Sequence, residues 1–354
     1  MGNKKFLLAL AIVFLAASCN PFTKTLPGGV LKSVNGGADW QFANRIASST
    51  TVSLAGLNIA KLSFSPQNRE TLFMGSYTGG LYKSEDSGGS WKNILSKIYV
   101  YDFVISPYDV KTIYVAGFYA DHGRVLKTTD GGASWNQVYN EESAANAVRA
   151  IAINPNNPSQ LVIGMTSGSV VKSADGGMSW QLANNFSDRI NRVLWQNGNV
   201  YVLTKTKGLF KSSGFADNFT DLTETLSKTF SLQNLSYNKD TIDSFSQVFV
   251  DFSTPTLIYT TTNKGVFKTV DEGKTWTKQN LPVKPDESEA KAIAIAPSTS
   301  NIVYSSVGST IYKSIDGGET WQTQSITSAG FINYILIDPQ LPQIVYAGIY
   351  VLQE

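Results

Sequence analysis

The chain of 354 residues has a formal net charge of +2, with 29 Lys and Arg against 27 Asp and Glu. This near-neutral balance gives no electrostatic case for a nucleic-acid partner. Hydrophobic residues make up 42% of the chain and aromatic residues 12%, which is enough for a large core. The 29 Gly, beside abundant Thr, Tyr, Val and Ile, favour strands and tight turns over helices.

The N-terminus has the pattern of a targeting segment. Two lysines, Lys4 and Lys5, precede an apolar run from Phe6 to Ala17 that is too short to span a bilayer comfortably. The run ends in Ala-Ala-Ser-Cys, and Cys19 is the only cysteine of the chain. This ending resembles the lipobox of bacterial lipoproteins. The resemblance implies a signal peptide over residues 1–18, acylation of Cys19 and a tether over residues 19–29. An ordinary secretory signal with an incidental cysteine is the alternative.

An eight-residue pattern, Ser/Thr-x-Asp-x-Gly-x-x-Trp, recurs along the rest of the chain. Five copies are complete, a first copy has Asn in place of Asp, and the copy at Ser212–Phe219 keeps only the Ser and an aromatic residue. The closing aromatic residues are 39 to 57 residues apart, which suits a four-stranded propeller blade. The third and eighth residues of the six better copies are Asn35 and Trp40, Asp86 and Trp91, Asp130 and Trp135, Asp175 and Trp180, Asp271 and Trp276, and Asp316 and Trp321.

Each copy lies within a longer unit of four short β-rich runs, seen most clearly in residues 147–182, with the box on the last turn. The first box follows only a half unit, Val30–Lys32, and the chain ends with two runs, 331–339 and 344–348, that have no box after them. The C-terminal pair must therefore complete the N-terminal pair, because closing the ring removes unpaired strand edges. The sequence predicts an all-β fold over residues 30–354: a single seven-bladed β-propeller of four-stranded blades, closed by a blade that the N- and C-terminal strands share.

The box itself predicts a structural turn. Its Asp can accept hydrogen bonds from turn N–H groups, its Gly permits positive φ, and its Trp can pack against the blade. A calcium loop gathers several carboxylates, whereas each box offers one, so we expect no metal and no cofactor. Asn35, and the missing carboxylate of the copy at Ser212–Phe219, are then expected to be tolerated losses.

The boxes resemble Asp-box, or BNR, repeats, which occur in sialidases, sortilin-type receptors, xyloglucan-cleaving glycosidases and the photosystem II assembly factor family of cyanobacteria and plastids. The resemblance covers nearly all of the mature chain. It is closest overall to the assembly factor family, whose members are exported lipoproteins with one seven-bladed propeller. It implies that the boxes are structural and that any binding site is on the opposite rim.

On that rim, polar and aromatic residues at the starts of the first strands and in one long turn are candidates. The turn with His122, the only histidine, is either an aromatic, mixed-charge docking or sugar-stacking patch or a hydrated surface loop. The segment from Leu222 to Phe245 is either a lid or partner loop or a plain surface loop. The candidate residues of the rim are Lys61, Tyr101, Asp102, Tyr119, Asp121, His122, Arg124, Arg149, Arg192 and Lys291.

The sequence offers little support for catalysis. It has few arginines and no sialidase-type arginine motif, and Asp102 and Asp121, from one blade, are the only nearby carboxylates for a glycosidase. We therefore expect a non-catalytic, monomeric propeller. It would be exported, held by its lipid on the periplasmic or outer face of a bacterial membrane, and would offer its rim to a protein or a surface glycan. A polysaccharide-binding or glycoside-hydrolase-like propeller is the alternative.

Overall fold

The structure is a computed structural model that describes residues 28–47, 53–226, 242–284, 288–326, 328 and 330–352. Cys19, the signal segment and most of the insertion between Leu222 and Phe245 lie outside the described residues. Within them, no helix is both long and apolar enough to cross a bilayer.

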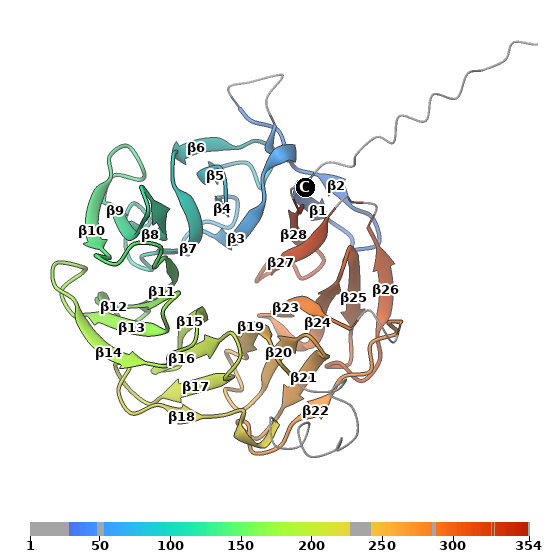
Figure 1. Cartoon of the computed structure of the whole chain (residues 1–354). Helices are drawn as coiled ribbons and strands as arrows, with labels where there is room; N and C mark the ends of the chain where they lie inside the picture. The colour runs from blue at the N-terminus through green and yellow to red at the C-terminus, as the bar shows by residue number, and fades with distance from the viewer. Residues whose placement is uncertain are drawn as a thin grey trace, which may run out of the picture.

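The predicted fold is confirmed: seven antiparallel sheets of four strands stand around a central channel (Figure 1). A short 3-10 helix, η1 (Leu54–Gly56), leads into the first complete blade. The blades are β3–β6 (Ile59–Phe64, Leu72–Ser76, Gly80–Ser84, Lys92–Leu95), β7–β10 (Tyr99–Ile105, Ile113–Tyr119, His122–Thr128, Asn136–Asn140), β11–β14 (Val148–Asn154, Asn157–Met165, Ser169–Ser173, Gln181–Asn185), β15–β18 (Ile190–Gln196, Asn199–Thr204, Leu209–Ser212, Thr220–Asp221), β19–β22 (Phe245–Val250, Ile258–Thr262, Gly265–Thr269, Thr277–Lys278), β23–β26 (Ala290–Ala296, Thr299–Val307, Thr310–Ser314, Gln322–Ser325) and the shared blade of β1 (Gly29–Ser33), β2 (Gln41–Phe42), β27 (Phe331–Ile337) and β28 (Val345–Tyr350).

The shared blade closes the ring as predicted. Strand β1 pairs with β28 over five residues, from Gly29 opposite Ile349 to Ser33 opposite Val345. Seven buried apolar clusters each join two neighbouring blades, so the core is a closed circle of blade interfaces. Burial between blades, rather than within one blade, is what makes a single repeat unable to fold alone.

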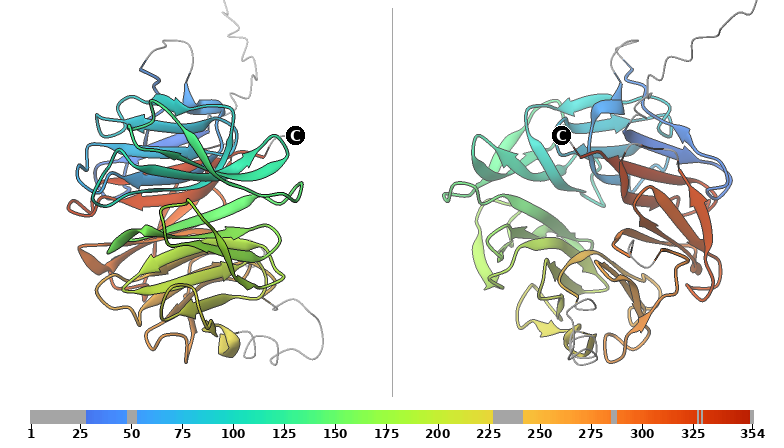
Figure 2. Two further views of the ribbon diagram at one scale, coloured as in Figure 1. Left: turned by 90° about the vertical axis from the view of Figure 1, so that its left-hand side faces the viewer. Right: turned by 45° about the vertical axis from the view of Figure 1, so that its right-hand side comes forward.

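The antiparallel order gives the ring two different faces (Figure 2). The turn from the first to the second strand and the turn with the box lie at one end of each blade, which we call the box face. The turn from the second to the third strand and the connection to the next blade lie at the other end. We call this second end the mouth face, because the channel opens there between the starts of the innermost strands.

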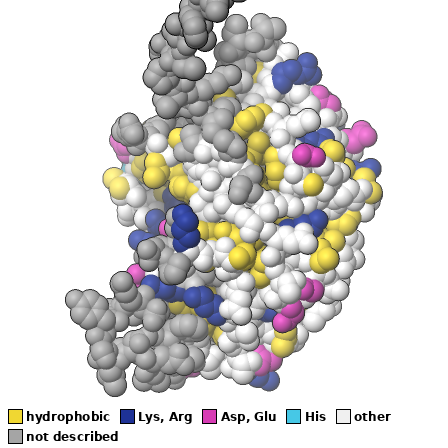
Figure 3. Space-filling view, turned by 90° about the vertical axis from the view of Figure 1, so that its right-hand side faces the viewer, with side chains coloured by type: hydrophobic (Ala, Val, Ile, Leu, Met, Phe, Trp, Pro, Cys, Tyr) yellow, Lys and Arg dark blue, Asp and Glu magenta, His cyan; other side chains and the backbone are white. Residues whose placement is uncertain are grey.

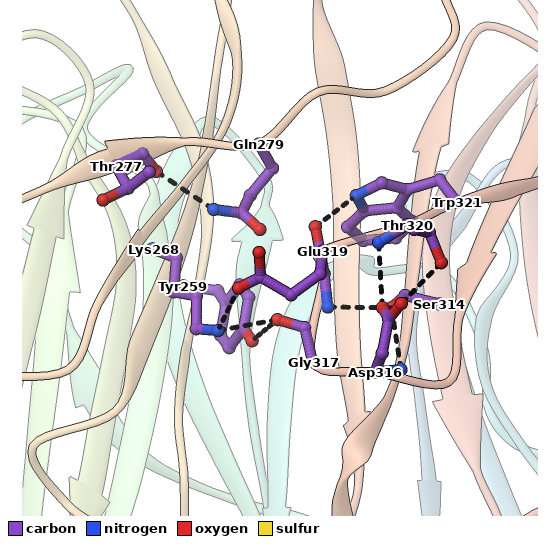
Figure 4. Close-up of polar contacts among 11 residues, drawn as sticks. Tyr259, Lys268, Thr277, Gln279, Ser314, Asp316, Gly317, Glu319, Thr320 and Trp321 are labelled. Atoms are coloured by element: carbon purple, nitrogen blue, oxygen red, sulfur yellow. Dashed lines mark hydrogen bonds and ion pairs between the residues drawn. The ribbon is translucent and has the colours of Figure 1, made fainter.

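Each complete box folds into the same closed hydrogen-bond pattern, which Figure 4 shows for the last copy. In the last copy, the Asp316 carboxylate accepts from Ser314 Oγ at 2.7 Å and from Thr320 N at 2.9 Å, as well as from Thr320 Oγ1. Ser314 Oγ in turn accepts from Gly318 N. Gly318 has a φ of 94°, a backbone conformation that favours glycine. These bonds hold the pKa of Asp316 at about 2. The carboxylate is therefore occupied by its own turn.

The first box is a rearranged box and not a damaged one. Asn35 Oδ1 accepts from Asp39 N and Ser33 Oγ, as the Asp of other boxes does. Its amide Nδ2 then donates to Asp39 Oδ2 at 2.8 Å. In the complete boxes the seventh residue, which corresponds to Asp39, is Ser or Thr, and its hydroxyl donates to the Asp. The carboxylate has thus moved four residues along the chain. Asn35 was expected to be a tolerated loss, and the turn keeps its hydrogen bonds because Asp39 supplies the carboxylate.

The boxes also fasten each blade to the next. Four of the Trp side chains donate from Nε1 to a backbone carbonyl of the preceding blade, at 2.8–2.9 Å. In the opposite direction, Tyr304 Oη and Lys313 Nζ both donate to the carbonyl of Gly36 in the first box, at 2.9 and 3.0 Å. In three other blades an equivalent Tyr and Lys both donate to one backbone carbonyl of the next box. These pairs are Tyr346 with Lys32, Tyr114 with Lys127 and Tyr259 with Lys268.

Candidate binding site at the channel mouth

A β-bulge interrupts every innermost strand close to its start on the mouth face. The register with the second strand shifts there in all seven blades. Such a bulge leaves one residue unpaired and re-aims its side chain. Six of the residues at these shifts line one cavity of about 170 Å³ at the mouth, namely Tyr101, Arg149, Asn191, Ser246, Lys291 and Asn333.

Four aromatic rings form a continuous arc along one side of this mouth. Phe331 and Tyr350 are stacked, with ring centroids 5.0 Å apart. Tyr77 contacts Tyr350 at 5.5 Å and Tyr101 at 5.6 Å. The guanidinium of Arg149 then lies 4.0 Å from the centroid of the Tyr101 ring, a cation–π contact. The arc joins three blades and ends in a positive charge.

The rest of the mouth is basic. Arg189 stands beside Arg149, and its pKa is lowered first by burial and next by the charge of Arg149. Arg149 Nε is buried with no hydrogen-bond partner among the described residues. Arg192 Nε donates to Gln247 Oε1 at 3.1 Å. Two guanidinium groups that stand together with no ion pair to a described carboxylate are a ready site for an anion.

No carboxylate forms an ion pair with these arginines within the part of the chain that the structure describes. The lining of the two mouth cavities contains no Asp or Glu. The charge of nearby Asp188 partly offsets the lowering of the Arg189 pKa, but its carboxylate accepts from the backbone N–H groups of Thr206 and Lys207. Glu289 pairs with Lys291. By contrast, the side of the ring in Figure 3 carries basic and acidic side chains interspersed among neutral ones.

Below the mouth, Lys61 and Asp102 form an ion pair in the channel wall. Lys61 Nζ lies 2.6 Å from Asp102 Oδ1, and the Asp102 carboxylate also accepts from the backbone N–H groups of Phe103 and Ile151. Asp102 is only 2% exposed. Its candidate role on an open rim is therefore wrong, because every hydrogen bond that it makes joins it to the channel wall. A second, mainly apolar cavity of about 210 Å³ continues down the channel past Arg192 and Gln247.

The predicted rim residues do not form one patch. Tyr101, Arg149, Arg192 and Lys291 meet at the mouth, whereas four others belong to the β8–β9 hairpin and line neither mouth cavity. Within that hairpin, Arg124 Nε donates to the Tyr119 carbonyl and its guanidinium lies 5.5 Å from the Tyr119 ring. Asp121 has a positive φ in the hairpin turn, and His122 Nδ1 is 2.9 Å from the Glu141 carbonyl oxygen.

The sequence prediction missed several members of the mouth, among them three rings of the aromatic arc and the second arginine: Tyr77, Phe331, Tyr350 and Arg189. Tyr77 follows the end of β4 and Tyr350 ends β28, so both stand where a second strand reaches the mouth face. Arg189 and Phe331 stand at the start of an innermost strand. The signal that could have found them is position within the repeat, applied to aromatic residues as well as to polar ones.

Comparison with known proteins places the fold but not the family. No family model matches the chain, and no curated protein matches it. Among solved structures, YCF48 bound to a D1 peptide aligns with a TM-score of 0.61 at 17% identity, covering 84% of this chain and 93% of that one. A GH74 xyloglucanase from Xanthomonas campestris aligns with a TM-score of 0.65 at 15% identity, covering 83% of this chain and 51% of the enzyme.

A third neighbour is the extracellular domain of the one-component system BT4673 from B. thetaiotaomicron. It aligns with a TM-score of 0.61 at 14% identity, covering 83% of this chain and 38% of that one. At these identities the likeness is one of fold. The chain spans about half the length of the xyloglucanase. The neighbours thus include a peptide-bound protein, an enzyme and an extracellular domain, and the shared fold does not distinguish between these functions.

Proposed function

We propose that this chain is an exported, lipid-anchored, non-catalytic propeller that holds an anionic segment of a partner protein at its channel mouth. The observation that supports it most is the pair Arg149 and Arg189, which share the mouth with an aromatic arc and have no lining carboxylate. Arginine favours carboxylates because its planar fork can bind both oxygens. Aromatic residues beside it add contact area of the kind that protein interfaces favour.

The same geometry argues against glycoside hydrolysis at the mouth. That reaction uses two carboxyl groups on either side of the scissile bond. Among the described residues, the channel cavities contain one, Asp102, and it is buried in an ion pair with Lys61. The peptide-bound structural neighbour adds support, because the alignment covers 93% of the YCF48 chain and that structure holds a D1 peptide.

The lipid anchor belongs to this proposal as well. It depends on Cys19 in its lipobox-like context. Mass spectrometry of the mature protein from a bacterial membrane fraction should find a diacylglyceryl group on Cys19, and Cys19→Ala should release the chain from that fraction. A mature chain that keeps an unmodified Cys19 would contradict this part of the proposal.

A direct comparison of two ligand panels tests the binding function. The full chain is mixed with labelled Asp/Glu-rich peptides, with their Asn/Gln counterparts, and with xyloglucan and glucan oligosaccharides. We expect binding of the acidic peptides, weak binding of the neutral ones, and no cleavage of any oligosaccharide. Hydrolysis, or binding of oligosaccharides in preference to acidic peptides, would favour the glycosidase-like alternative.

A further inference from the structure

The described chain enters the propeller at the rim of the mouth. Strand β1 is the third strand of its blade and therefore starts at the mouth face. Just before it, Gly28 N donates to the Ala55 carbonyl at 2.8 Å. A Cβ on Gly28 would lie 3.2 Å from Val351 Cγ2, so the entry point touches the last strand's end.

The end of the last strand belongs to the mouth. Val351 and Asn58 exchange two hydrogen bonds, at 3.0 and 2.8 Å. Asn58, Tyr350 and Leu352 line the cavity that also contains Arg149 and Arg189. The point at which any N-terminal tether joins the fold is thus part of the same rim as the anion site.

The length of the tether limits which face can approach the membrane. Eight residues lie between Cys19 and Gly28, and the nine residue-to-residue steps from one to the other span about 30 Å when fully extended. An innermost strand of seven residues, such as β7, is about 23 Å long before its turns are added. To turn the box face to the bilayer, the tether would have to run straight along nearly the whole thickness of the ring. With the mouth face toward the bilayer it needs almost none of its length.

The charge of the mouth acts in the same direction. Three arginines line the mouth cavity, whose lining contains no carboxylate, and basic side chains are attracted to anionic bilayer surfaces. We propose that the lipid anchor turns the mouth face toward the membrane, so that the segment held there is a membrane-proximal acidic segment of a membrane-embedded protein. This inference rests on the proposed function, and specifically on its lipid anchor.

Two alanines of one blade allow a matched test of the orientation. Ala144 is exposed on the mouth face between β10 and β11, and Ala133 is exposed in a box on the opposite face between β9 and β10. Each is replaced by Cys in the full lipidated chain and labelled with a fluorophore, because acylated Cys19 does not react. The chains are bound to phosphatidylcholine vesicles that carry a quencher on the headgroup.

We expect the label in Ala144→Cys to be quenched at least twofold more than the label in Ala133→Cys. Equal quenching, or stronger quenching on the box face, would overturn the orientation, and so would a chain that fails to bind the vesicles. Inserting about 20 Gly and Ser residues after Asn20 gives a flexible tether and should reduce the difference; an unchanged difference would overturn the tether as its cause. Failure of the acidic peptides to bind would leave the quenching result standing, so the two proposals fail separately.

Discussion

At the scale of single residues, the box carboxylates are structural acids. Asp175, Asp271 and Asp316 have a pKa of about 2 because each accepts hydrogen bonds from a hydroxyl, a backbone N–H and a second hydroxyl of its own turn. An Asp in an unfolded chain has a pKa near 3.9. Because the folded value is lower, these residues stabilise the fold above about pH 4, and that stabilisation is lost as the pH falls toward 2.

The direction of this pH dependence can be tested on one box. Asp316→Asn keeps the acceptor for Ser314 and for the Thr320 N–H but loses the acceptor for Thr320 Oγ1. We expect its melting temperature, followed by near-ultraviolet circular dichroism, to be lower than that of the wild type at pH 6. The gap should narrow as the pH falls toward 2, because the wild-type Asp316 is then protonated. A gap that stays constant over this range would contradict the structural role of the charge.

The rearranged first box predicts a second substitution that should restore the stability lost in Asp316→Asn. Asn35 works there because Asp39 accepts from its amide at 2.8 Å. Adding Thr320→Asp to Asp316→Asn rebuilds that arrangement in the last box. We expect the double variant to recover most of the lost melting temperature at pH 6, whereas Thr320→Asp alone should lower it by placing two carboxylates side by side. If the double variant is less stable than both single variants, the equivalence of the two boxes is wrong.

At the scale of elements, the fastening of blade to blade depends on residues outside the box. The Tyr of the second strand and the Lys of the third strand reach the same carbonyl of the next box in four interfaces. The blade of β15–β18 is different. Lys211 pairs there with the Glu272 side chain, and the Tyr201 hydroxyl is buried with no partner among the described residues.

This difference supplies a matched pair of variants. Tyr304→Phe removes a hydroxyl that donates to Gly36 at 2.9 Å, so we expect it to lower the free energy of unfolding by about 1 kcal/mol. Tyr201→Phe removes an unsatisfied hydroxyl from an equally buried ring and should leave the stability unchanged or raise it. Urea unfolding measures both. Equal losses in the two variants would show that the hydrogen bond to the box is not what stabilises the interface.

The sequence was sufficient for the fold but only partly for the mouth. The number of repeats and the two half units predicted the number of blades, because the ring closes only if the two half units combine into one complete four-stranded blade. The mouth depends on bulges, which change the direction of Arg149 and Tyr101 by a register shift that leaves no mark in composition. Asp102, one residue beyond Tyr101, was therefore expected on the same surface but is buried below it. A Lys directly precedes every box in the sequence, but the sequence-based expectations gave this Lys no role.

At the scale of the whole molecule, a closed and rigidly fastened ring holds one asymmetric feature. The aromatic arc lies on the shared blade and the two blades that follow it, and Arg149 and Arg189 stand at the starts of the innermost strands β11 and β15 of the next two blades. A ring of this kind can present such a patch without reorganising, which lowers the entropic cost of binding. The chain's entry point lies on the same rim. In the function proposed above, the binding surface and the anchor therefore belong to one face.

The central claim is that Arg149 and Arg189 bind the anionic group of a partner segment. Fluorescence anisotropy of a labelled Asp/Glu-rich peptide measures it in the full chain and in Arg149→Gln with Arg189→Gln. The control, Lys92→Gln with Lys111→Gln, removes the same charge from exposed positions away from the mouth. We predict that the arginine variant binds at least about tenfold more weakly at low salt, while the control stays within about twofold of the wild type. Equal weakening in the two variants, or none in either, would contradict the account.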